Sequence, residues 1–173
     1  MKKKPVKKSS LWNGGVKMAY EIREMDPSEY GVLSNFLYEA IFQRDDNNRL
    51  PRSVIQEPAL RIYIEDFGNM KDDRCLCAVT DNRIVGAVWT RIIKGYGSLD
   101  DNTPEFAISL YPEYRGKGIG MALMKKMLEY LEQEGYEKAL QKDNYALGMY
   151  QKAGFTIVDE NEEEYIMRIA LKE

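Results

Sequence analysis

The chain contains no histidine among its 173 residues. This absence excludes Ser-His-Asp and Cys-His nucleophile systems, histidine-based metal helices and histidine proton shuttles. Any acid–base chemistry must therefore use carboxylates, tyrosines, lysines or water.

Cysteine is also scarce, since Cys75 and Cys77 are the only two. They lie two positions apart in a strand-like run, so their side chains point to the same face. Two sulfurs without histidine make a poor zinc site. We expect two buried thiols rather than a metal or redox site, and no bound metal.

Long hydrophobic runs are missing as well. No apolar run approaches the ~20 residues that cross a membrane, and no signal-like apolar stretch follows the basic N-terminus. The composition, 44% hydrophobic and 31% charged, is typical of globular proteins with one core. We therefore expect a cytoplasmic chain with no membrane partner.

Acidic residues are absent before Glu21. Removing the six lysines of this stretch from the net charge of −3 leaves −9 for the remainder. Residues 1 to about 18 are expected to form a flexible basic arm, followed by a single domain over residues 19–173. The alternative is that the arm contacts nucleic acid or an acidic partner, but nucleic acid is not expected because the remainder of the chain is acidic.

Hydrophobic periodicity predicts one domain in which strands and helices alternate. Asp26-Pro27-Ser28-Glu29 has the pattern of a helix N-terminus, with an N-cap, proline at N1 and glutamate at N3. Helices are expected at about residues 26–41, 58–66, 121–134 and 144–152. Strands are expected at 20–25, 75–80, 84–93, 106–110, 138–141, 155–158 and 165–171.

A glycine-rich turn precedes the helix expected at 121–134. Between Tyr114 and Leu128 the chain has four cations and no acid, although the rest of the domain is acidic. Glycines at 116, 118 and 120 allow close backbone approach, and the N–H groups of the next helix are unpaired donors. A pyrophosphate is the natural occupant. Neither GxxxxGK[ST] nor GxGxxG is present, and close packing in the turn is the structural alternative.

The segment from Ile108 to Gly120 resembles the acetyl-CoA-binding motif of the GCN5-related N-acetyltransferase (GNAT) superfamily. The core of that motif, Arg/Gln-x-x-Gly-x-Gly/Ala, corresponds to residues Arg115 to Gly120. A second block, Asn144 to Phe155, is similar to the superfamily's Asn-x-Ala-x-x-x-Tyr-x-x-x-Gly-Phe segment. Together with the order of elements, the resemblance covers nearly the whole chain except the arm.

The resemblance implies an α/β (α+β) fold, with a mixed, mostly antiparallel sheet of about six to seven strands flanked by about four helices. It also implies acetyl-CoA as cosubstrate, with pantetheine hydrogen-bonded along the strand at residues 106–110. The residues that the resemblance assigns to cofactor binding are Ile108, Leu110, Arg115, Gly116, Lys117, Gly118, Ile119, Gly120 and Asn144.

The implied reaction is direct acetyl transfer to a primary amine of a small molecule or peptide. With no histidine, a carboxylate is the leading candidate for the base, and Glu105 is our first choice, acting through water. The alternative for Glu105 is a solvated residue at a strand end. By resemblance Tyr150 protonates the leaving thiolate; the alternative is a packed helix aromatic.

One departure from the superfamily pattern concerns the strand before Asn144, which spans only about five residues and is expected to be truncated or shifted in register. This departure suggests a second hypothesis, a catalytically silent acyl-CoA-binding protein with a regulatory or interaction role. The sequence does not identify the amine acceptor, and a homodimer is a further possibility that the resemblance allows.

Overall fold

The computed structural model describes residues 8–13, 16–41, 47–93, 100–143, 147–162 and 165–172, with side chains from Ala19 onward except at positions 141 and 143. Its centre is an eight-stranded sheet in the order β1-β2-β3-β4-β5-β6-β8-β7. All neighbouring strands are antiparallel except the parallel pair β5 and β6. The strands are β1 Lys8–Asn13, β2 Val16–Glu24, β3 Arg74–Thr80, β4 Arg83–Arg91, β5 Glu105–Leu110, β6 Lys138–Asp143, β7 Thr156–Glu160 and β8 Tyr165–Ala170.

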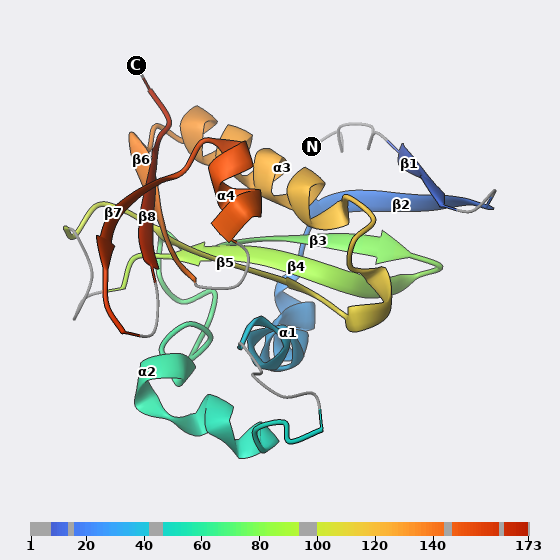
Figure 1. Ribbon diagram of the computed structural model, residues 1–173, viewed down its shortest axis with the longest axis horizontal. Helices are drawn as coiled ribbons and strands as arrows, with labels where there is room; N and C mark the ends of the chain where they lie inside the picture. The colour runs from blue at the N-terminus through green and yellow to red at the C-terminus, as the bar shows by residue number, and fades with distance from the viewer. Residues whose placement is uncertain are drawn as a thin grey trace.

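Helices cover both faces of this sheet. In Figure 1, α3 and α4 lie on one face, and α1 and α2 lie on the other. The helices are α1 Leu33–Ala40, α2 Pro58–Arg61, α3 Ile119–Gln133 and α4 Leu147–Ala153, with short 3-10 helices η1 Pro27–Val32, η2 Arg52–Gln56 and η3 Pro112–Tyr114. The predicted fold, a mixed and mostly antiparallel sheet with flanking helices, is confirmed.

The pleat of β5 divides the core into two clusters. Phe106, Ile108 and Leu110 pack with α3 and α4, whereas Ala107 packs in the cluster of α1 and the following segments. Ser109 Oγ donates a 2.6 Å hydrogen bond to the carbonyl of Phe36 on the α1 side. Because β5 is covered on both faces, its position in the sheet is fixed by burial on each side.

Several local expectations are confirmed. Asp26 caps η1 by accepting a hydrogen bond from the Ser28 N–H, and Glu29 accepts one from the Asp26 N–H, which completes a capping box. The expected helix over 26–41 consists of η1 followed by α1. Cys75 and Cys77 are buried free thiols, as predicted, and both belong to the cluster on the α1 side of the sheet.

Other expectations differ from the structure. Lys8–Asn13 forms a strand that pairs with residues 16–21 of β2, so the predicted flexible arm is wrong for residues 8–13 and 16–18; residues 1–7, 14 and 15 lie outside the described residues. The single domain over 19–173 stays a prediction. The helix expected at 58–66 is confined to α2, and turns follow it.

The strand before Asn144 is longer than expected. β6 contains six residues, Lys138–Asp143, whereas about five were expected. Truncation relative to other members of the superfamily, or a shift in register, stays a prediction. Within the described part of the chain, no helix is both long and apolar enough to cross a membrane.

Candidate active site

The glycine turn connects β5 to α3 and is built on left-handed backbone. Gly116 has φ 70° and Gly118 has φ 79°, a region that side chains with a Cβ rarely adopt. Gly118 is the N-cap of α3, and no side chain among the described residues caps this end. The first-turn N–H groups of α3 therefore remain available to an anionic ligand. A Cβ at Gly116 would meet no atom within 4 Å, so space is open beside the turn.

The second element of the site is the edge of β5 that faces β6. All six residues of β5 pair with β4, but among the described residues the only register pair with β6 joins Glu105 and Leu140. The N–H of Leu140 also bonds the carbonyl of Pro104 at 2.9 Å. Beyond this point the two strands separate, and the backbone of Phe106–Ser109 on that side is not paired with β6. An extended ligand with amide groups could bond this edge as an added strand does.

The cations of the turn are arranged differently from what the motif alone suggests. Arg115 Nε donates to the carbonyl of Leu110 at 3.1 Å, and its Nη2 bonds Glu39 Oε2 at 2.8 Å. Arg115 thereby ties the turn to the end of β5 and to α1. Lys117 Nζ bonds the carbonyl of Glu113 at 2.8 Å and lies over the ring of Tyr114. These contacts hold both cations close to the turn. The groups that the turn offers most directly to a ligand are therefore its backbone N–H donors.

The remaining predicted cofactor-binding residues lie in different surroundings. The side chains of Ile108, Leu110 and Ile119 are buried in the core, so these residues can offer a cofactor only their backbone groups. Gly120 lies against Leu110, and a Cβ at position 120 would lie 3.2 Å from Leu110 Cδ1. Asn144 lies outside the described residues.

Glu105 is buried, with only 4% of its surface exposed, so the solvated alternative is wrong. The hydroxyl of Tyr63 donates a 2.6 Å hydrogen bond to Oε2. Lys142 Nζ, on β6, lies 3.1 Å from Oε1 and forms an ion pair with it. No described donor, this ammonium included, reaches Oε1 with good hydrogen-bond geometry, so this oxygen retains capacity for a further donor. A buried carboxylate with such capacity can accept a proton from a bound amine.

A buried network holds the segment that carries Tyr63. Trp89 Nε1 donates to the carbonyl of Tyr63 at 3.1 Å, and Arg91 Nη1 donates to the carbonyl of Ile62 at 2.8 Å. Arg91 also forms a bidentate pair with Asp73, at 2.9 and 2.8 Å, in which both side chains are almost fully buried. Trp89 and Arg91 of β4 thus hold the backbone of the segment that carries Tyr63, and β5 supplies Glu105.

Tyr150, on α4, is buried and its ring packs edge-to-face against Phe155 with ring centroids 5.6 Å apart. The packing expected by the alternative interpretation is therefore present. Its role as proton donor stays a prediction. Both cysteines are also buried. Loss of solvation raises the pKa of Cys77 to about 11, and it raises the pKa of Cys75 well above its ordinary value.

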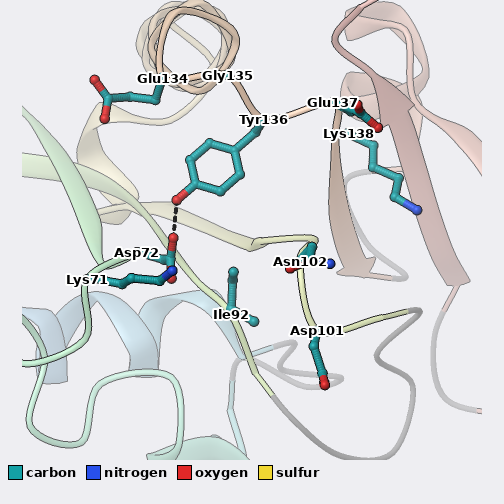
Figure 2. A pocket seen from close by; sticks show the side chains of 10 residues that line it. All are labelled: Lys71, Asp72, Ile92, Asp101, Asn102, Glu134, Gly135, Tyr136, Glu137 and Lys138. Atoms are coloured by element: carbon teal, nitrogen blue, oxygen red, sulfur yellow. Dashed lines mark hydrogen bonds between the residues drawn. The ribbon is translucent and has the colours of Figure 1, made fainter.

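An open, polar pocket of about 530 Å³ lies at the opposite end of α3 from the glycine turn. Figure 2 shows Tyr136 pointing across it to Asp72, and the Tyr136 hydroxyl donates a hydrogen bond to that carboxylate. Burial and this carboxylate raise the pKa of Tyr136 to about 12. Since α3 has 15 residues, the pocket is about 22 Å along the helix from the glycine turn.

Sequence reasoning found the glycine turn and Glu105 but missed Tyr63, Lys142 and the Asp73–Arg91 pair. No motif links these residues, because their contacts depend on how β4, β5 and β6 align. The one sequence feature that could have drawn attention to any of them is the position of Lys142, two residues before the Asn144 block. Among the described residues, no group of acidic or cysteine side chains is arranged to hold a metal.

Comparison with known proteins gives concordant matches. Residues 38–155 match the model of the acetyltransferase (GNAT) family. Mycothiol acetyltransferase of Kocuria rhizophila is 31% identical over 123 residues, 67% of this chain but 39% of that protein, so the chain spans about two fifths of that relative's length.

Solved structures agree on the fold. The PaiA N-acetyltransferase of Thermoplasma acidophilum, in complex with coenzyme A, has a TM-score of 0.64 at 21% identity, covering 88% of this chain and 99% of that one. The yncA protein of Salmonella typhimurium, determined with acetyl-CoA, has a TM-score of 0.61 at 15% identity, covering 89% and 95%. Identities this low establish a shared fold and nothing finer.

Proposed function

Because the chain belongs to the acetyltransferase (GNAT) family, we propose that it transfers the acetyl group of acetyl-CoA directly to a primary amine of a small molecule or peptide. The single observation that carries this proposal is the unpaired edge of β5 leading into the uncapped N-terminus of α3. An extended amide chain ending in a pyrophosphate has the two chemical features that this edge and this helix end can bind.

The residues present fit that cosubstrate. The backbone of the turn from Gly116 to Gly120 would hold the pyrophosphate, aided by the cation of Lys117, and the backbone of β5 would bond the pantetheine amides. Asn144 would add a contact, as the superfamily motif implies. Acetyl-CoA supplies an activated thioester, so the protein has only to position it and manage protons.

Proton removal is the step that most needs the protein. A free alkyl amine, with a pKa of about 10.4, is only about 0.04% neutral near neutral pH, a cost of roughly 4.6 kcal/mol. In our proposal Glu105 receives this proton, directly or through a water, while Tyr63 holds its other oxygen. Tyr150 returns a proton to the leaving thiolate; a phenol is almost fully protonated near neutral pH, as a donor must be.

The name of the Kocuria relative, mycothiol acetyltransferase, supports acetyl transfer as the reaction. It does not identify the acceptor here, because the chain matches only part of that protein. The cytoplasmic location and the absence of a metal requirement stay predictions of the sequence.

The test combines acetyl-CoA binding, measured by calorimetry, with free-thiol release in the presence of a panel of primary amines. Glu105→Gln should lower kcat by about 10²-fold or more while the Kd for acetyl-CoA changes little. Glu129→Gln is the matched control, because this carboxylate on α3 is exposed and forms an ion pair with the exposed Lys126. This substitution should leave both quantities unchanged. Tight binding without turnover on any amine would instead favour the silent acyl-CoA binder.

Tyr150→Phe tests the second role. Removing the hydroxyl should lower kcat by about tenfold or more between about pH 6 and 10. If kcat is unchanged across this range, Tyr150 is a packing residue and the proton comes from elsewhere.

A further inference from the structure

Lys142 lies on β6 at the point where this strand separates from β5. It is two residues beyond Leu140, which forms the register pair with Glu105. Its side chain crosses the gap between the strands and brings Nζ to 3.1 Å from Glu105 Oε1. Only 11% of the Lys142 side chain and 3% of the Glu105 side chain are exposed, so the pair is shielded from bulk water.

An acceptor that gives its proton directly to Glu105 would occupy the position of the Lys142 ammonium. For Glu105 to remove a proton directly from an acceptor, the acceptor nitrogen must come within hydrogen-bond distance of a carboxylate oxygen. Oε2 is occupied by the Tyr63 hydroxyl, whereas Oε1 faces Lys142 and keeps capacity for a donor. A primary amine of the protein itself therefore lies where the amine of an acceptor is needed.

We propose that Lys142 is a self-acetylation site, at which the protein modifies its own ε-amine with acetyl-CoA when no acceptor is bound. The inference rests on the proposed function, since it uses the same cosubstrate and the same carboxylate. It requires no group other than those two, and it predicts that acceptor and Lys142 compete for Glu105.

The Lys142 ammonium gives one proton to Glu105, and its nitrogen attacks the thioester carbonyl carbon. The new N–C bond forms, the C–S bond breaks and coenzyme A leaves with the electron pair of that bond. The nitrogen loses a second proton, the thiolate takes up one, and Glu105 returns its proton to solvent, so one proton is released overall.

Lys138 allows the reactivity of Lys142 to be compared with that of a more exposed lysine. The side chain of Lys138, on the same strand, is 36% exposed, and its Nζ lies 2.6 Å from the partly exposed carboxylate of Asp100. Uncatalysed acetylation in solution favours such accessible amines. Selective modification of the more buried Lys142 would therefore require the site itself.

Acetylation would change the site that performs it. An amide at position 142 has no charge, so the positive partner of Glu105 would be lost and the Tyr63 hydrogen bond would remain. The modified enzyme should then differ from the unmodified enzyme in its use of external amines.

The experiment incubates the full chain with acetyl-CoA alone and maps acetylated lysines by peptide mass spectrometry over time. We expect acetylation at Lys142 at least about tenfold faster than at Lys138. Lys142→Arg should eliminate this modification while keeping the positive charge. Glu105→Gln should slow it about tenfold or more, and Lys138→Arg, the matched control, should leave it unchanged.

The possible failures are distinguishable. Equal acetylation of Lys138 and Lys142 in the wild-type chain would overturn the inference, whether or not the variants fold. If the protein binds acetyl-CoA and acetylates an external amine while Lys142 stays unmodified, the inference is wrong and the proposed function stands. If calorimetry detects no binding of acetyl-CoA, the proposed function fails and the inference fails with it.

Discussion

The hydroxyl of Tyr63 donates a 2.6 Å hydrogen bond to Glu105 Oε2, joining the segment after α2 to the first residue of β5 across 42 positions of sequence. The carboxylate is buried, so this bond forms in a medium of low dielectric constant. It fixes one oxygen and leaves the other toward the gap between β5 and β6.

Tyr63→Phe tests what this bond does. A hydrogen bond to a charged group contributes about 1.5–3 kcal/mol, so the free energy of unfolding should fall by about that amount. If the bond also orients Glu105, kcat should fall about tenfold or more while KM for acetyl-CoA is unchanged. Tyr30→Phe is the control, since the Tyr30 ring packs on Phe67 at the same face of the sheet. A loss of stability with unchanged kcat would leave Tyr63 with a structural role only.

Gly118→Ala tests the left-handed N-cap of α3. With φ 79° at this position, a Cβ should cost about 1–2 kcal/mol of stability and displace the N–H groups of the turn. We expect the Kd for coenzyme A to rise about tenfold, measured by calorimetry. Gly31→Ala, in η1, is the matched substitution, because a Cβ there meets no atom within 4 Å and the residue has no positive φ. Equal affinities in the two variants would count against the turn as the pyrophosphate site.

Arg91→Met tests the buried pair beneath Tyr63. Removing the guanidinium leaves the Asp73 carboxylate buried without its cation, which should lower the free energy of unfolding by about 3–5 kcal/mol. Guanidinium chloride unfolding followed by tryptophan fluorescence measures this change. Arg61→Met removes an exposed partner of Glu65 and should cost less than about 1 kcal/mol. Similar losses in both variants would show that burial does not strengthen the pair.

The cysteines make stability depend on pH on the alkaline side. Burial raises the pKa of Cys77 to about 11, whereas an unfolded thiol has a pKa of about 8.5. Below about pH 8.5 both states are protonated and the full stability is present; as the pH rises toward about 11, the unfolded state loses its proton first and stability falls. Cys77→Ala should flatten this decline.

Native protein should also resist thiol reagents near pH 8, and rapid labelling without denaturant would contradict the burial of both thiols.

Features set by neighbouring residues were predictable from the sequence. Asp26 and Glu29 specify a capping box within one turn of chain, and it forms as expected. The glycines at 116 and 118 do take positive φ, because the turn into α3 needs backbone that other residues resist. The apolar run at residues 106–110 also becomes part of the buried strand β5.

Features that depend on distant alignment were not predictable. Nothing near Tyr63 in the sequence indicates that its hydroxyl meets Glu105, and Asp73 and Arg91 meet only because β3 and β4 are adjacent antiparallel strands. The solvated interpretation of Glu105 failed for the same reason: a residue at the start of a strand is exposed unless another segment covers it. Here the segment after α2 does so, through Tyr63.

The alternation along β5 also makes the site sensitive to insertions and deletions. Glu105 and Ser109 face the α1 side, and Phe106 and Leu110 face the α3 side. A single-residue deletion just before Glu105 that shifted the strand by one position would exchange the two faces. The carboxylate would then enter the apolar cluster and an aromatic ring would meet Tyr63. Insertions or deletions in the segment entering β5 are therefore tolerable only where the loop before the strand absorbs them. The chemistry depends on the register of this one strand.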